Sequence, residues 1–293
     1  MNEPTHVTKG LHDAWPLPEP GSGKHSRGTV LMVGGSASVP GAMLLAGEAS
    51  LRAGGGRLQV ATTAGVAGQM GVTIPEALVS RTPEVDSGDI APAAAEQILG
   101  LAENASAILL GPGITSPEAA TALLREIVPR LRHQSVVVDA LGSAYVTEDI
   151  TCLHHLEATA VLTVNPSETA HALAVEKTQV HEDPLAATIE LARTARAVVL
   201  CGAGDKFVAT PEGRTWQVSV DCPGLGVSGS GDVQAGIVTG LLARGAEPAQ
   251  AAVWGAWLHG RAGEALAESV GPLGFLAREL PAALPGLLAE LSR

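Results

Sequence analysis

The chain of 293 residues is predicted to adopt an α/β fold in which helices cover both faces of a mostly parallel sheet. Three observations indicate this class. Short apolar runs rich in β-branched residues recur along the chain, alanine-rich stretches with helical spacing separate them, and several runs end in glycine or a carboxylate. Runs that are apolar throughout suit strands buried on both faces. We therefore expect three layers, with ligands bound beyond the carboxyl ends of the strands.

The predicted elements follow in order along one domain. Residues 206–220, KFVATPEGRTWQVSV, predict a hairpin or two edge strands, because TPEG is turn chemistry between alternating segments. Neither a repeat nor a break in composition is present, so we expect a single domain over 24–293 after an N-terminal extension over 1–23. Apolar strands are predicted within 29–35, 57–63, 107–113, 135–141, 160–166 and 197–204, and helices over AMLLAGEASLRAG, SPEAATALLREIVPRL, DPLAATIELARTA, VQAGIVTGLLARG, PAQAAVWGAWLHGRAGEALAE and 280–291.

Composition excludes several classes of partner. Eighteen Lys and Arg against 30 Asp and Glu give a net charge of -12, which argues against nucleic acid. The chain holds no run of 18 apolar residues and its start lacks a secretory signal pattern, so neither a membrane span nor secretion is expected. Its three cysteines, Cys152, Cys201 and Cys222, lack CxxC spacing, which favours reduced thiols and a cytoplasmic location.

The segment GLGVSGSGDVQAG at 224–236 carries the strongest chemical signal. Gly229 and Gly231, with Ser230 between them, can turn main-chain N–H groups toward an anion at the start of a helix. Asp232 would then be placed to accept a proton from a hydroxyl that attacks a phosphoryl group. The alternative is that Asp232 only caps the helix. The glycine-rich approach favours the catalytic interpretation.

A second motif, NPSE at 165–168, places two oxygen-bearing side chains three residues apart. Asn165 and Glu168 could hold Mg²⁺ directly or through waters, or they could be an N-cap and an acid in the first helical turn. Asp139, at the end of VVVD, either orients a ligand or a water on the metal, or caps the next segment. The histidines are predicted to be structural or solvated. Dinucleotide GxGxxG, P-loop and nucleophile-elbow motifs are absent from the sequence.

Taken together, these segments resemble the ADP- or ATP-dependent NAD(P)H-hydrate dehydratases, a branch of the ribokinase-like superfamily. The resemblance covers residues 24–268, and its most specific parts are PGAMLLAGEASLRAGGG and the GSGD region followed by HGRAGE. It implies a three-layer α/β/α ribokinase-like fold, related to the carboxy-terminal domain of bifunctional NAD(P)H-hydrate repair enzymes. The remaining segments that carry it are GTVLMVGGSASV, LLGPG, VVVDAL, LTVNPSE, VVLCGAGDKFVATPEGR and AAVWGAWLHGRAGE.

The resemblance also implies a repair reaction. The hydroxyl of hydrated NADH or NADPH would be phosphorylated with ADP or ATP and Mg²⁺, and phosphate would then leave. Asp232 would be the base on the hydroxyl, and Glu168 would help to arrange the metal. A homo-oligomer such as a tetramer is expected. The hydrate would touch Ala42, Gly113, Asn165 and Asp232, and the adenine nucleotide would touch Cys201, Gly202, Ala203, Gly204, Asp205, Gly229, Ser230 and Gly231.

Three departures from the family pattern leave alternatives open. One is GPGIT where the family has GPGLG, together with the absence of a second acid after Asp139. Asn165 stands where a histidine is usual and Cys201 stands where a lysine is usual, and Lys206 is the nearest lysine in sequence. NPSE also resembles the NxxE of sugar and vitamin kinases in the same superfamily. A small-molecule kinase would share the fold, metal and base, and would release a stable phosphorylated product. A catalytically impaired nucleotide-binding protein would bind ADP or ATP and turn nothing over.

Overall fold

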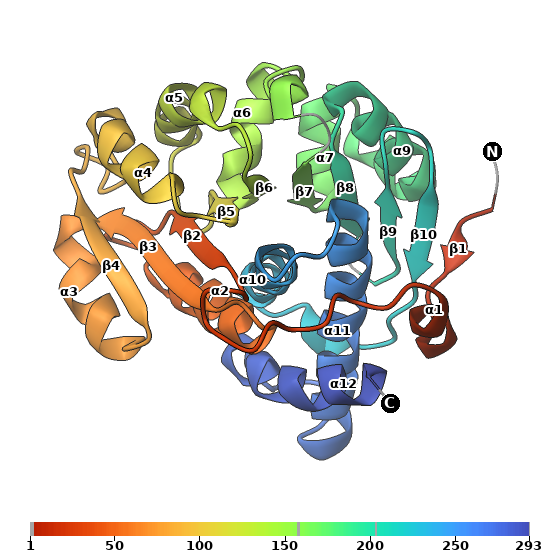
Figure 1. The fold of residues 1–293 in the computed structure, drawn as a ribbon. Helices are drawn as coiled ribbons and strands as arrows, with labels where there is room; N and C mark the ends of the chain where they lie inside the picture. Colours follow the sequence, from red (N-terminus) through yellow and green to blue (C-terminus); the bar gives the residue numbers. More distant parts are fainter. Residues whose placement is uncertain (1–2, 157–158, 203, 293) are drawn as a thin grey trace.

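The computed structural model describes residues 3–156, 159–202 and 204–292, which form one sheet with helices on both faces (Figure 1). The ten strands are ordered β1-β10-β9-β8-β7-β6-β5-β2-β3-β4. Neighbours from β8 to β4 run parallel, β9 is antiparallel to both β8 and β10, and β1 is parallel to β10. The predicted α/β class and mostly parallel sheet are confirmed.

The helices and strands have the following bounds. None of the helices in the described ranges is both long enough and apolar enough to cross a membrane. The strands are β1 (Thr5–His6), β2 (Thr29–Val33), β3 (Arg57–Thr63), β4 (Ala77–Thr82), β5 (Ala107–Leu110), β6 (Ser135–Asp139), β7 (Ala160–Val164), β8 (Val198–Gly202), β9 (Lys206–Ala209) and β10 (Thr215–Val218). The helices are α1 (Lys9–Ala14), α2 (Gly41–Arg52), α3 (Ala64–Thr73), α4 (Ala95–Ala102), α5 (Pro117–Ile127), α6 (Ser143–Glu148), α7 (Pro166–Leu173), α8 (Lys177–Glu182), α9 (Pro184–Ala195), α10 (Ser230–Ala243), α11 (Pro248–Ser269) and α12 (Leu284–Leu291).

Each of the six predicted apolar runs contains a strand, and 206–220 forms the antiparallel pair β9–β10. Its turn closes with Gly213 N–H donating to Thr210 O at 2.9 Å, and Gly213 takes a φ of +88°. The edge strand β4 was missed because its sequence, ALVSRT, is only partly apolar. An edge strand keeps polar side chains in solvent, and so it lacks the apolar run that marks the inner strands.

Alternate residues of the inner strands enter two separate hydrophobic cores. In β2, Val30 and Met32 face the core beneath α2, α10, α11 and α12, whereas Leu31 and Val33 face the core beneath α4, α5 and α9. All four side chains are fully buried, as expected for a strand covered on both faces. The two cores give the three layers predicted from the sequence.

The N-terminal segment crosses α11 and ends at the sheet edge (Figure 1). Thr5 and His6 of β1 pair with β10, and Trp15 stacks on Trp216 with ring centroids 5.3 Å apart. Gln250 on α11 donates to Pro16 O at 2.7 Å. The part of the predicted extension from Val7 to Leu17 is therefore packed against the same core as the rest of the chain.

Helix α10 lies against α2 with almost no side-chain spacing between the two backbones. A Cβ atom at Gly236 would lie 2.3 Å from Ala46 O, and one at Gly240 would lie 2.3 Å from Ser50 O. Only glycine permits backbones to approach so closely. This contact fixes the position of α10, whose first turn carries the GSGD motif.

We predict that Gly236→Ala lowers the free energy of unfolding by about 1–3 kcal/mol, because the added methyl group must push α2 and α10 apart. Gly100→Ala is the matched control: Gly100 lies exposed on α4, and a methyl group there would meet no atom within 4 Å. It should stabilise the protein by about 0.5–1 kcal/mol through helix propensity. Urea unfolding monitored by circular dichroism measures both. Equal stability of Gly236→Ala and wild type would show that the helix contact can relax.

Candidate functional site

A cavity of about 240 Å³ opens where β6, β7 and β8 end and α10 begins. This is the edge of the sheet at which open α/β folds bind ligands. Six of the residues predicted from the sequence share it, together with Asp139. The cavity is lined by Asp139, Ala140, Thr163, Val164, Asn165, Glu168, Gly202, Gly229, Gly231, Asp232 and Gln234.

The GSGD turn forms the start of α10. Gly229 is the N-cap residue, with a φ of +90° and no side chain to occupy the first free N–H groups of the helix. A Cβ atom at Gly229 would lie 2.4 Å from Leu45 Cδ1, whereas one at Gly231 would meet no atom within 4 Å. Ser230 N–H donates to Val227 O at 3.2 Å, so the turn offers the cavity the backbone of Gly229 and Gly231 and the positive end of α10, which suits an anion.

Asp232 lies in the first turn of α10 and lines the cavity, but it is not the N-cap residue. The side chain is half-buried, and burial raises the pKa of Asp232 to about 6. A carboxylate with this pKa is mostly ionised at neutral pH and binds a proton more tightly than an exposed aspartate. Asp232 is therefore not the cap of α10, and its carboxyl group is available to the cavity.

Asp139 ends β6 and is almost fully buried. Burial raises the pKa of Asp139 well above its usual value, although Thr163 Oγ1 donates to its Oδ1 at 2.7 Å and lowers it. The negative charges of Asp232 and Glu168 raise this pKa further. Three carboxyl groups therefore face one cavity, and a cation there would favour the ionised form of Asp139.

The NPSE segment forms a capping box at the start of α7. Asn165 Oδ1 accepts from the N–H groups of Ser167 at 2.8 Å and Glu168 at 3.0 Å, and Glu168 Oε2 accepts from Asn165 N–H at 2.9 Å. The capping alternative is thus realised, while both residues still line the cavity. Burial raises the pKa of Glu168.

The residues of the cavity fit Mg²⁺ held mainly by water and phosphate. Within the described ranges, no three His, Cys, Asp or Glu side chains are grouped so as to hold a metal ion. Mg²⁺ commonly keeps several waters and takes one or two carboxylates together with substrate phosphates. Asp139 and Glu168, both with pKa values raised by burial, supply such carboxylates without forming a complete protein cage.

Other predicted site residues lie outside the lining of this cavity. Ala42 is buried near the start of α2, and Gly113 follows β5, where a Cβ atom would lie 2.5 Å from Val39 O. Cys201 Sγ lies 3.2 Å from Thr169 Oγ1, and burial raises the pKa of this thiol. Gly204 and Asp205 are exposed between β8 and β9, and Ala203 lies outside the described residues.

Four side chains support the site: sequence reasoning missed Thr163 and Gln234, and it named Lys206 only as the nearest lysine and His259 only as a structural histidine. Thr163 holds Asp139, as described above. Lys206 Nζ donates to Gln234 Oε1 and, at 2.7 Å, to His259 Nδ1, and His259 Nε2 lies 2.9 Å from Ser230 Oγ. These partners are separated by 28 to 53 residues. No local motif could therefore connect them.

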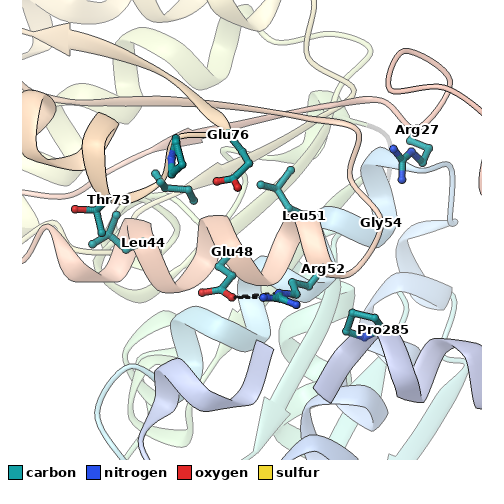
Figure 2. Close-up of a pocket in the computed structure, with 11 residues that line it drawn as sticks. Arg27, Leu44, Glu48, Leu51, Arg52, Gly54, Thr73, Glu76 and Pro285 are labelled. Carbon is teal, nitrogen blue, oxygen red and sulfur yellow. Dashed lines mark hydrogen bonds and ion pairs between the residues drawn. The ribbon is translucent and has the colours of Figure 1, made fainter. Parts of the chain in front are cut away.

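A larger cavity of about 630 Å³ lies elsewhere, at the amino ends of β2, β3 and β4 (Figure 2). Its walls include Arg27 and Glu76, and Arg52 pairs with Glu48 at 3.0 Å along α2. In a parallel sheet the amino and carboxyl ends of the strands lie at opposite edges. This cavity is therefore separate from the one that contains Asp232, and the sequence motifs gather at the smaller one.

We predict that Asp139→Asn stabilises the protein at pH 7 and has less effect at pH 4. The folded state raises the pKa of Asp139, so ionisation lowers stability as pH rises above the unfolded value of about 3.9. Asparagine keeps an oxygen that can accept from Thr163. Thermal unfolding across pH 4–7 measures the difference.

Asp149→Asn is the control of opposite sign, because hydrogen bonds from Thr151 lower the pKa of the exposed Asp149. It should lower stability at pH 7 and have less effect as pH falls. If Asp139→Asn destabilised the protein equally at both pH values, burial of the charge would not be the dominant effect.

Comparison with known proteins identifies the family. The sequence model described as NAD(P)H-hydrate dehydratase matches residues 30–285. The chain is 41% identical over 288 residues to the ADP-dependent (S)-NAD(P)H-hydrate dehydratase of Xanthomonas campestris pv. campestris, covering 98% of this chain and 97% of that one. The chain therefore belongs to the NAD(P)H-hydrate dehydratase family, which confirms the family and the lyase class predicted from the sequence.

Solved structures agree on the fold. A ribokinase-like superfamily protein from Enterococcus faecalis V583 matches with a TM-score of 0.84 and 22% identity, covering 98% of this chain and 96% of that one. The ADP/ATP-dependent NAD(P)H-hydrate dehydratase from Bacillus subtilis, co-crystallised with ATP and Mg²⁺, matches with a TM-score of 0.79 and 24% identity over 99% of both chains. The predicted ribokinase-like fold is confirmed.

Proposed function

We propose that this member of the NAD(P)H-hydrate dehydratase family phosphorylates the hydroxyl of hydrated NADH or NADPH with an adenine nucleotide and then eliminates phosphate. The observation that carries the proposal is the position of Asp232, a half-buried carboxylate directly beside an open anion-binding turn. The family match favours this reaction over a small-molecule kinase, whose phosphorylated product would be stable. The 41%-identical relative is named as ADP-dependent, which supports an adenine nucleotide as the donor.

Asp232 starts the reaction by accepting the proton of the substrate hydroxyl. The hydroxyl oxygen then bonds to the terminal phosphorus as the bridging P–O bond breaks, which yields AMP from ADP or ADP from ATP. Next the C–O bond breaks, and phosphate leaves with the electron pair. Loss of a proton from the neighbouring ring carbon restores the double bond of the dihydropyridine. Phosphorylation is needed because hydroxide is a poor leaving group.

The nucleotide phosphates fit against the GSGD turn. The N–H groups of Gly229 and Gly231 and the start of α10 would stabilise charge on the transferred phosphoryl group. Ser230 borders the same turn, but its N–H donates to Val227 O at 3.2 Å. Gly202, on the opposite wall, extends the same surface toward Gly204 and Asp205. Cys201 borders the nucleotide only through its backbone, because its side chain is buried in the core.

Two further groups of residues complete the proposed site. Asp139 and Glu168 would hold Mg²⁺ largely through water, and the cation would neutralise charge on the phosphates. The nicotinamide hydrate would lie between Asn165, the start of α2 that carries Ala42 and the loop that carries Gly113. ATP and Mg²⁺ in the Bacillus subtilis crystals support both ligands.

We also propose that copies of the chain assemble into a homo-oligomer such as a tetramer, in the cytoplasm. Val72 and Leu78 are 82% and 55% exposed on neighbouring α3 and β4, which leaves apolar surface for a contact between copies. All three cysteines are free, which agrees with a reducing compartment.

We predict that Asp232→Asn abolishes turnover but leaves nucleotide binding detectable. The amide has nearly the same shape as the carboxylate and cannot accept the hydroxyl proton. The assay follows recovery of reduced-nicotinamide absorbance from NADH hydrate with Mg²⁺ and ADP or ATP, and calorimetry follows nucleotide binding. For the wild type, kcat/KM should fall as pH drops through about 6, where Asp232 becomes protonated. A fully active Asp232→Asn variant would remove this acid from the mechanism.

We predict that Glu168→Gln raises the Mg²⁺ concentration needed for half-maximal turnover by about 10–100-fold. Glutamine still accepts from Asn165 N–H in the capping box, so α7 should keep its start while the charge is lost. Glu176→Gln, at the exposed start of α8, is the control and should leave the Mg²⁺ requirement unchanged. An unchanged requirement in Glu168→Gln would exclude this carboxylate from holding the cation.

A further inference from the structure

Lys206 is a buried cation behind the phosphate-binding turn. It opens β9, and its side chain is only 2% exposed. Among the described residues it makes no ion pair with a carboxylate. Its Nζ instead donates to His259 Nδ1 at 2.7 Å and to Gln234 Oε1. Lysine is rarely buried without an acidic partner, so this arrangement calls for a function.

His259 links Lys206 to the GSGD turn by hydrogen bonds. Its side chain is 4% exposed on α11, and its Nε2 lies 2.9 Å from both Ser230 O and Ser230 Oγ. When Lys206 carries its ammonium, which has only hydrogens to offer, Nδ1 of His259 accepts. The neutral imidazole then carries its proton on Nε2, which donates to Ser230 O. Burial and the nearby Lys206 lower the pKa of His259 well below its usual value and favour this neutral form.

Lys206 holds one face of the first turn of α10 through two routes. It bonds to Gln234 directly, and it reaches Ser230 through His259. Ser230 and Gln234 are four residues apart and therefore lie on the same helix face. Gly231 and Asp232 lie between them and line the cavity. Gln234 also lines the cavity, so holding Ser230 and Gln234 in place holds the backbone and the carboxylate of this turn in place as well.

We propose that Lys206 and His259 are positioning residues that hold the GSGD turn and that the charge of Lys206 strengthens binding of the nucleotide phosphates on its other side. This inference rests on the proposed function of the same cavity. Lys206 does not line the cavity, but it donates to Gln234, which does, so its charge would act through Gln234, Ser230 and the start of α10.

Binding should consequently be linked to proton uptake. Burial lowers the pKa of Lys206 to about 7, so at pH 8 most free protein carries a neutral amine here. An anion bound opposite the turn favours the ammonium form, which raises this pKa. The titratable groups that face Lys206 are His259 on α11 and Cys222 before α10, and Asp232 lies on the adjoining helical turn. Asp232 and the nucleotide phosphates are already ionised at pH 8.

The test is calorimetry of ADP and ATP binding between pH 7.5 and 9, in buffers with different heats of ionisation. Wild type should take up close to one proton at pH 8, and its Kd should weaken as pH rises. Lys206→Met should weaken binding about tenfold at pH 7.5 and abolish both the proton uptake and the pH dependence. Lys177→Met, at an exposed position on α8, is the matched control and should match wild type.

His259 is tested by a pair of substitutions that separates positioning from packing. Gln can accept from Lys206 and donate to Ser230, whereas Leu can do neither. His259→Leu should lower kcat and weaken nucleotide binding, and His259→Gln should restore much of both, with KM for the hydrate unchanged in each. Thermal unfolding checks that the variants are folded.

The outcomes separate this inference from the proposed function. Calorimetry uses nucleotide alone, so proton-linked binding with no turnover of NADH hydrate would refute the proposed reaction and still support the role of Lys206. Turnover of the hydrate together with unchanged binding and proton uptake in Lys206→Met would refute the role of Lys206. Failure of the wild type to bind nucleotide would overturn both.

Discussion

The backbone contact between α2 and α10 determines where the chemical groups of the site can lie. Gly236 and Gly240 let α10 rest directly on the carbonyl groups of Ala46 and Ser50, so the helix cannot shift without a clash. Helix α10 begins beside the carboxyl ends of β6 and β7, where Asp139 and Asn165 lie. A shift of α10 by the width of one methyl group would change the distance between Asp232 and the other side chains that line the cavity. Such misplacement can reduce catalysis far more than it reduces stability.

Given this geometry, the site combines charges of opposite sign on its two sides. Asp139 and Glu168 come from the sheet edge and α7, and both carry pKa values raised by burial. The start of α10 contributes positive potential, and Lys206 lies behind it. A cation is favoured on one side and an anion on the other. The nucleotide phosphate and Mg²⁺ of the proposed function would satisfy both preferences at once.

The sequence predicts those elements of the protein that are determined by residues close together in the chain. Inner strands such as β2 and β6 are recognisable because burial on both faces requires continuous apolar runs, and the GSGD turn is recognisable because only glycine takes the φ of Gly229. The edge strand β4 was missed because exposure permits polar residues there. NPSE was correctly read as an ambiguous motif: the same two side chains both cap α7 and line the cavity. Their spacing alone could not show that both roles coexist.

The hydrogen bonds that join Lys206 and His259 to the GSGD turn could not be predicted. They connect residues that are far apart in the sequence, so no local pattern reveals them. His259 reads as one polar residue in an apolar helix, and Lys206 reads as the polar start of an edge strand. Together they form a polar cluster that is unfavourable for folding. The folded state lowers the pKa of Lys206, so its burial destabilises the protein most below about pH 7, and the penalty fades as pH rises toward about 10.4. A methionine would fill the same space without this penalty. A buried cation that lowers stability is expected where it favours binding of an anion, because functional sites commonly retain groups that reduce stability.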